Sequence, residues 1–244
     1  PDILICHGYI GSSDNWRFIA KKLASNYTIH CIDCRNHGES FHKDTMTYQD
    51  MSKDVEAYIS DKKLTNVSLI GHSMGGKIVM QMATNQPNRF NKLIIVDIAP
   101  VTYTPHHQAI LKALKDTNLS ELTTIKDCDN SIKTHIKNDT IRGFIIKNIK
   151  RNEYNQLYWK INVNAIINNY NEILKAPQFK EQILSKTLVI NGESSEYNIL
   201  KDKETFKKWC KHLTFNTING VGHWVQAEAP TEFYNLITPF LERK

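Results

Sequence analysis

The amino-acid sequence predicts an α/β protein in which a mostly parallel central sheet carries helices on both faces and is interrupted by a helical insertion. Short apolar runs alternate with segments that repeat apolar residues at the helical period, which indicates a parallel sheet. The apolar runs lack polar alternation, and this is typical of strands buried on both faces. From Thr102 to Lys186 helical periods continue without a convincing strand.

The individual elements follow from where each periodic pattern begins and ends. Strands are expected at residues 2–6, 27–32, 67–70, 93–96, 187–190 and 213–218. Helices are expected around residues 16–23, and at 48–64, 77–83 and 230–241. Within the insertion, Ile110, Leu111 and Leu114 share one helical face.

The insertion divides the chain into three parts. We expect residues 1–101 and 187–244 to form the two halves of one α/β core, with residues 102–186 as a helical cap. A chain of 244 residues, of which 41% are hydrophobic, suffices for one sizeable core. Because ligands bind at the carboxyl edge of such sheets, we expect the cap to cover that edge.

The composition also bears on the compartment. No apolar run is long enough to span a bilayer. The five cysteines are an odd number in a large chain, which favours a reducing compartment such as the cytoplasm over a disulfide framework. The chain begins with Pro1 directly before a strand-like run, which is compatible with a trimmed N-terminus, and no signal-peptide pattern opens it.

The net charge of +6 is concentrated in the middle of the chain, where residues 98–186 hold 13 basic and 8 acidic side chains. Basic residues there alternate with Asn and Ile, and no nucleic-acid motif accompanies them, so we expect no nucleic-acid partner. A solvated helical surface is the simpler interpretation. The alternative is that Arg142 and Lys147 recognise an anionic leaving group, such as a coenzyme A phosphate.

The strongest motif is Gly71-His72-Ser73-Met74-Gly75, a G-x-S-x-G between a predicted strand and a predicted helix. This is the context of a nucleophile elbow, where a tight turn holds the serine hydroxyl exposed at the sheet edge. Glycines are needed because side chains beside the serine would collide with neighbouring backbone. Ser73 is therefore the candidate nucleophile.

A serine hydroxyl needs a base to accept its proton. His223 follows the strand expected at 213–218 and lies in the sequence Gly220-Val221-Gly222-His223-Trp224, whose glycines allow the loop to reach over the sheet edge. The oxyanion needs two backbone donors. We expect these to be the amides of Met74, which follows the nucleophile, and of Tyr9, in the H-G-x-x-G sequence after the first strand.

The histidine needs a third residue, a carboxylate that orients it, and the sequence offers several candidates for this role. After the strand at 187–190 the sequence reads Gly192-Glu193-Ser194-Ser195. A serine therefore stands where many hydrolases with a nucleophile elbow carry aspartate. Asp97 directly follows the strand at 93–96, which should lie beside the nucleophile strand. We favour Asp97 over Glu193, Glu196 or Ser195 as the carboxylate that orients His223.

These motifs give the chain a clear resemblance to the α/β-hydrolase superfamily and, within it, to the YbfF-type bacterial esterases and abhydrolase-domain-11 proteins. The similar stretches are HGYIGSSDNWRFIAKKLA, DCRNHGES, GHSMGGKIVMQMA, KLIIVDIAPV, RGFIIKNIKR and GVGHWVQAEAP. The resemblance implies the α/β-hydrolase fold and a Ser-Asp-His triad whose acid lies in the VDIAP segment, at Asp97. It also implies hydrolysis of acyl esters and thioesters.

The sequence therefore predicts a serine esterase or thioesterase that needs no metal or organic cofactor and acts on a small-molecule acyl substrate. Trp159 and Trp224 are candidates to line an apolar acyl pocket. Alternatives on the same fold are a carbon–carbon bond hydrolase or lyase, a perhydrolase, and a non-catalytic ligand-binding protein. The sequence predicts no oligomeric state.

Overall fold

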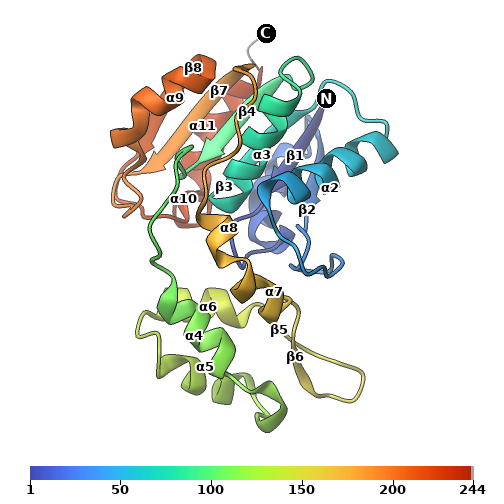
Figure 1. Cartoon of the computed structure of the whole chain (residues 1–244), viewed down its shortest axis with the longest axis vertical. Helices are drawn as coiled ribbons and strands as arrows, with labels where there is room; N and C mark the ends of the chain where they lie inside the picture. The colour runs from blue at the N-terminus through green and yellow to red at the C-terminus, as the bar shows by residue number, and fades with distance from the viewer. Residues whose placement is uncertain (243–244) are drawn as a thin grey trace.

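The computed structural model describes residues 1–242 and contains a central sheet of six strands. These strands are β1 (Asp2–Cys6), β2 (Thr28–Ile32), β3 (Ser68–His72), β4 (Lys92–Val96), β7 (Ile183–Gly192) and β8 (Cys210–Ile218). They are arranged in the order β2-β1-β3-β4-β7-β8, and every neighbouring pair is parallel (Figure 1). The predicted α/β class and parallel sheet are confirmed.

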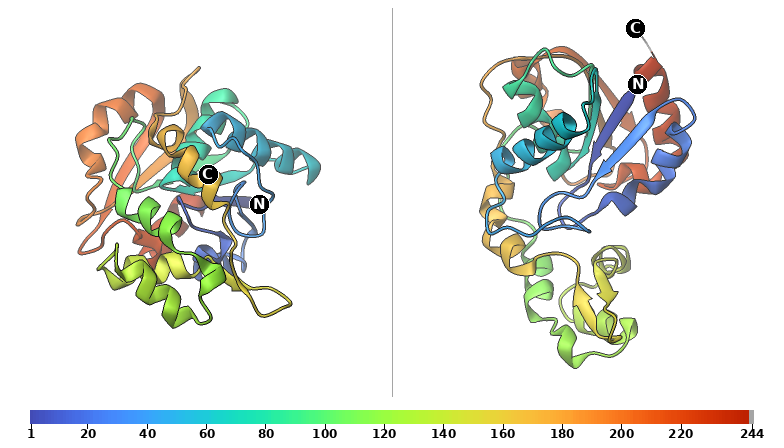
Figure 2. Two further views of the ribbon diagram at one scale, coloured as in Figure 1. Left: turned by 60° about the horizontal axis from the view of Figure 1, so that its bottom comes forward. Right: turned by 90° about the vertical axis from the view of Figure 1, so that its right-hand side faces the viewer.

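Helices cover both faces of the sheet, so it has an apolar core on each side (Figure 2). These helices are α1 (Arg17–Leu23), α2 (Tyr48–Asp61), α3 (Met74–Asn85), α9 (Lys203–Trp209) and α11 (Pro230–Glu242). On one face, Trp16 and Phe233 pack against Ile3 of β1. On the other face, Leu4 packs with α2, α3 and α9. Successive strand residues point to opposite faces, which is why unbroken apolar runs fill both cores.

The chain between β4 and β7 forms a second group of elements beyond the carboxyl ends of the central strands (Figures 1 and 2). These elements are α4 (Gln108–Asp116), η2 (Leu119–Glu121), α5 (Ile125–Lys133), α6 (Asp139–Ile146), β5 (Ile149–Arg151), β6 (Leu157–Trp159), α7 (Val163–Asn168) and α8 (Tyr170–Leu174). Through α7 and α8 the chain returns toward the sheet. This group is called the middle segment below.

The prediction that the middle segment contains no strand is wrong. β5 and β6 pair as an antiparallel hairpin, with Ile149 opposite Trp159. β7 also begins at Ile183, earlier than the residue 187 expected from sequence. Strands of three residues are too short to show an alternating pattern, and the first residues of β7 alternate in burial because they lie at the start of the strand.

Two further boundaries differ from expectation. α3 begins at Met74, immediately after the motif serine, although Gly75 and Gly76 are weak helix formers. α9 was not expected, since Phe206 is its only buried residue in a run rich in lysine. In α3, contacts with the sheet outweigh the local preference of the sequence, whereas the residues of α9 favour a helix but show no apolar period.

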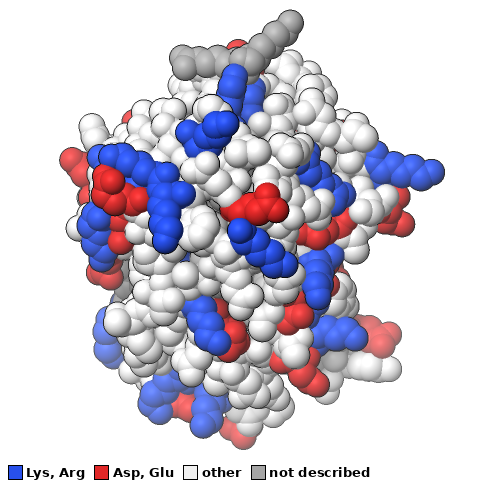
Figure 3. Space-filling model, turned by 45° about the horizontal axis from the view of Figure 1, so that its top comes forward, with Lys and Arg blue, Asp and Glu red and all other residues white. Residues whose placement is uncertain are grey.

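The connections after the strands end in short helical turns. The turn η1 (Ser13–Trp16) follows β1, η3 (Ile199–Asp202) follows β7 and α10 (Val225–Glu228) follows β8. None of the helices within residues 1–242 combines the length and apolar character that a membrane crossing requires. The five cysteines are free thiols. On the face seen in Figure 3, basic and acidic side chains are interspersed.

Candidate active site

Ser73 occupies a sharp turn between the end of β3 and the start of α3. Its backbone has φ 52° and ψ −119°, a conformation that residues other than glycine rarely adopt. The glycines around it are sterically required. A Cβ on Gly71 would lie 2.2 Å from the carbonyl oxygen of Gly75, and a Cβ on Gly75 would lie 2.2 Å from that of Cys6. Close packing of α3 against β1 and β3 therefore holds the strained turn.

Asp97 and His223 form a hydrogen-bonded pair at the same edge of the sheet. Asp97 follows β4, is fully buried, and also has a positive φ, of 50°. His223 lies in the loop after β8, with Nδ1 2.7 Å from Asp97 Oδ2. The amide of Gly192 donates to the other carboxylate oxygen at 3.1 Å, and the Ser195 hydroxyl donates to Oδ2. The buried carboxylate is thus surrounded by donors.

The two glutamates considered as alternatives lie elsewhere. The Glu193 carboxylate accepts a hydrogen bond from the amide of Gly220 at 2.9 Å, which ties its loop to the turn after β8. Glu196 is exposed and lines an outer groove. Among the residues considered for the third position, Asp97 is the carboxylate in contact with His223, and Ser195 contacts that carboxylate.

Backbone contacts hold the His223 loop in place. His72 Nε2 donates to the carbonyl oxygen of His223 at 2.8 Å. Burial lowers the pKa of His72 well below its usual value, so this imidazole is neutral. The amides of Gly222 and Trp224 donate to the Glu228 carboxylate at 2.7 and 3.1 Å. The loop that carries His223 is therefore fixed at both sides of the histidine.

Tyr197 is a site residue that the sequence analysis missed. Its ring stacks on the His223 imidazole, with centroids 4.1 Å apart and planes 15° apart. Its hydroxyl lies 2.9 Å from His106 Nε2. Burial raises the pKa of this phenol. The signal available from sequence was an aromatic residue in the loop after β7, at the edge where the motif residues gather.

The H-G-x-x-G loop passes directly beside the elbow, because a Cβ on Gly8 would lie 3.3 Å from Ser73 Cβ. Two buried histidines hold this loop. His7 Nε2 accepts the Cys34 amide at 3.0 Å, and His37 Nε2 accepts the Ile10 amide at 3.1 Å. Burial lowers the pKa of His37 to about 3, which keeps it neutral and able to accept.

The amides of Tyr9 and Met74 are available to a ligand. Within residues 1–242, the Tyr9 amide makes no hydrogen bond. Met74 is the first residue of α3, so its amide has no acceptor one turn earlier in that helix. The Tyr9 side chain points to the middle segment, where its hydroxyl donates to the Ile166 carbonyl at 2.9 Å.

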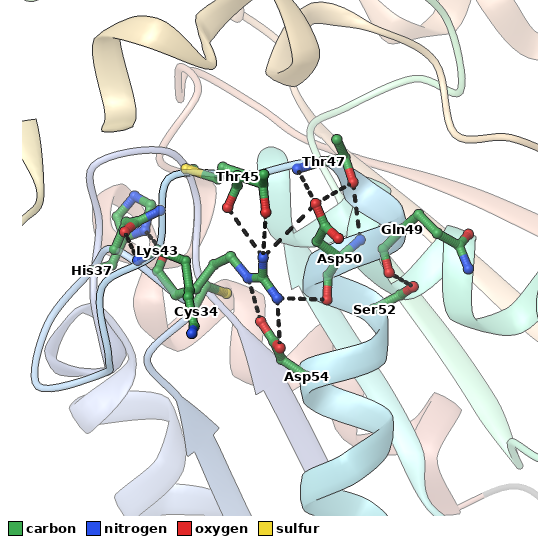
Figure 4. Close-up of polar contacts among 12 residues, drawn as sticks. Cys34, His37, Lys43, Thr45, Thr47, Gln49, Asp50, Ser52 and Asp54 are labelled. Atoms are coloured by element: carbon green, nitrogen blue, oxygen red, sulfur yellow. Dashed lines mark hydrogen bonds and ion pairs between the residues drawn. The ribbon is translucent and has the colours of Figure 1, made fainter. Parts of the chain in front are cut away.

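Asp33 and Arg35 connect the loops around this region by hydrogen bonds. The Arg35 guanidinium donates to both carboxylate oxygens of Asp54 at 2.6 and 2.7 Å and to the carbonyl of Thr45 at 3.1 Å (Figure 4). Asp33 accepts the amides of Ser13 and Glu39. Both side chains connect loops and lie outside the cavities around Ser73.

Four cavities lie around Ser73 and His223. A central cavity of about 30 Å³ contains both residues together with Phe144 and Trp224. Two larger grooves open from it, one of about 490 Å³ past Tyr197 and one of about 370 Å³ past His72. An inner cavity of about 20 Å³ continues behind Ser73.

The structure places only some of the residues predicted to bind substrate at the cavities. Trp224 lines the central cavity and both grooves, and Lys147 lines the 370 Å³ groove. Trp159 belongs to the β5–β6 hairpin and lines none of the four cavities. Phe144, whose ring centroid lies 5.4 Å from that of Trp224, stands in the cavity instead.

Arg142 does not lie where the sequence analysis expected it. Its side chain is buried in the middle segment, and its guanidinium contacts Asp129 at 2.8 Å and Asp139 at 2.7 Å. The same group donates to the carbonyls of Ile136 and Lys137. These partners, which lie near Arg142 on α5, α6 and their connection, occupy the donors that an anionic ligand would need.

The fold and this geometry define the class of protein. A family model described as the alpha/beta hydrolase fold matches residues 1–122. The chain belongs to this family, and the predicted α/β-hydrolase fold is confirmed.

Individual relatives agree with this assignment. The chain is 31% identical to the sn-1-specific diacylglycerol lipase ABHD11 of Xenopus laevis, covering 99% of this chain and 80% of that protein. It is 29% identical to the esterase YbfF of Escherichia coli, covering 98% and 92%. A solved structure described as a marine microorganism esterase superposes with a TM-score of 0.95 at 36% identity, covering 98% of this chain and 94% of that one. The resemblance drawn from the motifs is confirmed.

Proposed function

We propose that this chain is a serine hydrolase that cleaves carboxylic esters or acyl thioesters through an acyl-enzyme intermediate. The observation that carries the proposal is the 2.7 Å contact between buried Asp97 and His223, which lines the same cavity as Ser73 on its strained turn. The names of the relatives, an esterase and a lipase, support the same chemistry.

In the first half-reaction, the Ser73 hydroxyl attacks the acyl carbon while His223 Nε2 accepts its proton. The carbon–oxygen bond to Ser73 forms, and the electron pair of the carbonyl moves onto its oxygen. The amides of Tyr9 and Met74 stabilise that oxyanion. When the tetrahedral intermediate collapses, the bond to the leaving group breaks, and the imidazolium returns the proton to the departing oxygen or sulfur.

In the second half-reaction, water takes the place of the leaving group. His223 removes a proton from the water while the water oxygen forms a bond to the acyl carbon. The acyl–Ser73 bond then breaks, the imidazolium returns the proton to the serine oxygen, and the free acid is released. Asp97 keeps the proton of His223 on Nδ1 and stabilises the imidazolium. The donors on Asp97 from Gly192 and Ser195 support this role, because they favour the ionised carboxylate in a buried place.

The middle segment acts as a cap in this proposal, with residues 1–101 and 187–244 as the core. Support comes from the cavities, since Ile110 and Phe144 of the middle segment line the central cavity with Ser73 and His223 of the core. Lys147 and Trp224 would contact the leaving group in the groove of about 370 Å³. The five free cysteines support a reducing compartment.

The proposal is tested with the Ser73→Ala variant and a fluorophosphonate probe. Hydrolysis of p-nitrophenyl esters should fall by about 10⁴–10⁶-fold in the variant, because the nucleophile is lost. The probe should label the wild-type chain at Ser73 and leave the variant unlabelled. Retention of near wild-type hydrolysis by Ser73→Ala would contradict the assignment.

A further inference from the structure

The inner cavity behind Ser73 is the smallest of the four cavities. It is lined by aromatic side chains from Tyr9, Tyr48 and Tyr103, and by Ile173 and Leu174 of α8. Its volume of about 20 Å³ is close to the space of a single water molecule. A leaving group has to depart before water can enter, and the two open grooves serve that purpose. The small inner cavity, which Ser73 lines, is therefore suited to the acyl group.

One face of α3 carries a stripe of buried polar side chains toward this cavity wall. Lys77, Gln81 and Thr84 are spaced by four and three residues, so they lie on the same side of the helix. Their exposed fractions are 1%, 0% and 0%. Lys77 is one turn after Ser73, and its amide donates to the Ser73 carbonyl at 3.2 Å. We call these three residues the α3 polar stripe.

The α3 polar stripe bonds to the backbone of the segment that returns from α8 to β7, and this segment runs alongside α3 (Figure 1). Lys77 Nζ donates to the carbonyls of Leu174 and Lys175 at 3.0 and 2.6 Å. The Gln81 side chain pairs with both backbone groups of Gln178, at 2.9 and 2.7 Å.

Thr84 completes these contacts at the far end of the stripe. Its hydroxyl accepts the amides of Lys180 and Glu181, each at 3.0 Å, and donates to the Glu181 carbonyl. The three side chains thereby fix residues 174–181 along their length. Because the partners are backbone groups, the arrangement does not depend on the side chains of the returning segment.

An apolar helix face would be the ordinary way to pack α3 here, so the polar groups call for an explanation. Buried polar groups destabilise a fold unless each finds a partner. Lys77 has no carboxylate partner within residues 1–242, and burial lowers its pKa to about 7. Its ammonium lies 4.8 Å from the centre of the Tyr103 ring, another wall of the inner cavity.

We propose that the α3 polar stripe determines the acyl specificity of the enzyme by holding α8 against the inner cavity, so that Ser73 accepts short acyl groups and rejects long ones. This inference rests on the proposed ester hydrolysis at Ser73. The stripe acts by positioning: Gln81 and Thr84 bond to the returning backbone and line none of the inner cavity, whereas Ile173 and Leu174 form part of its wall.

The test compares p-nitrophenyl acetate, butanoate and octanoate as substrates of the wild-type chain and of the Gln81→Met/Thr84→Val double variant. Wild type should favour acetate over octanoate in kcat/KM by at least about tenfold, since an acyl pocket discriminates by size. In the double variant this ratio should fall by about tenfold, because unbonded backbone at 178–181 lets α8 move away from the cavity.

A hydrogen-exchange measurement and a control variant show whether the substitutions act through the returning segment. Hydrogen exchange at the amides of residues 178, 180 and 181 should accelerate in the variant, which reports that the segment has been released. The control is Thr238→Val on α11, where the hydroxyl donates to the Tyr234 carbonyl on the other face of the sheet. It makes the same substitution and should leave the acetate-to-octanoate ratio unchanged. If the double variant does not fold, Thr84→Val alone replaces it.

The possible failures are distinguishable. A wild-type chain that hydrolyses none of the esters and is not labelled at Ser73 would contradict the proposed function itself. An active wild-type chain that prefers octanoate would overturn only the specificity inference. So would an unchanged ratio in a variant whose returning segment exchanges faster.

Discussion

The nucleophile elbow and the middle segment line the same cavity but are held in different ways. The elbow is buried throughout, and its shape depends on backbone surfaces that approach too closely to admit a Cβ at Gly71 or Gly75. The helices of the middle segment are short and exposed on one side. They share an apolar cluster with the core and are also tied to it by separate hydrogen bonds, such as Asn148 Nδ2 to the Ile10 carbonyl at 2.9 Å.

The difference indicates that the two regions have separate roles. The positions of Ser73, Asp97 and His223 depend on close packing, which tolerates little change. The walls contributed by the middle segment depend on a few hydrogen bonds between side chains and backbone, as with Tyr9 and Ile166. Under the proposed function, the reaction would be set by the core and the choice of substrate by the middle segment.

After the loss of the nucleophile itself, the largest expected effect comes from the carboxylate in the core. Asp97→Asn should lower kcat by about 10³–10⁴-fold, because an amide cannot hold His223 in the tautomer that leaves Nε2 free to accept a proton. Steady-state hydrolysis of p-nitrophenyl acetate measures this. Glu193→Gln is the control, since Glu193 contacts the Gly220 amide and not His223, and it should keep most of the activity. Equal losses in both variants would remove Asp97 from the proposed triad.

A matched pair of glycine substitutions tests the contrast in packing. Gly75→Ala should destabilise the chain by about 3 kcal/mol or more, since its Cβ would lie 2.2 Å from the Cys6 carbonyl oxygen. Gly143→Ala, on α6 of the middle segment, meets nothing within 4 Å and should raise stability by up to about 1 kcal/mol through helix propensity. Urea denaturation measures both, and a harmless Gly75→Ala would refute the claim that close packing fixes the elbow.

The last expected effect is a pH dependence of stability that arises in the loop beside the elbow. His37 has its pKa lowered to about 3 by burial, whereas an unfolded histidine titrates near its ordinary value of about 6.5. Between these pH values the unfolded chain binds one more proton, so stability falls as the pH is lowered. The expected slope from this residue is about 1.4 kcal/mol per pH unit.

The His37→Gln variant isolates that contribution. Its stability at pH 8 will differ from wild type because the contacts with Ile10 and Arg35 change. The informative quantity is the slope of the unfolding free energy against pH between pH 6.5 and 4. This slope should be smaller in the variant by about 1.4 kcal/mol per pH unit, which is the contribution of one proton. Identical slopes in the two chains would show that His37 is not the group that titrates on unfolding.

Local patterns in the sequence were sufficient for the framework and for the candidates at the sheet edge. The strand at Leu93 to Val96, the glycine-flanked Ser73 and the glycine-rich loop around His223 are each recognisable within about ten residues of chain. This works because burial on both faces and a strained turn impose strict requirements on neighbouring residues. The hairpin of β5 and β6 was not predicted, because strands of three residues are too short to show an alternating apolar pattern.

What the sequence determined by itself was which residue types stand at the ends of the strands, and hence the fold class and the candidates Ser73, Asp97 and His223. The tertiary structure alone decided which partner each polar group meets. Arg142 is enclosed by Asp129 and Asp139, and Tyr197 stacks on His223. The physical reason is that a hydrogen bond or ring contact depends on distances within a few ångströms, between residues whose separation along the chain carries no information about them.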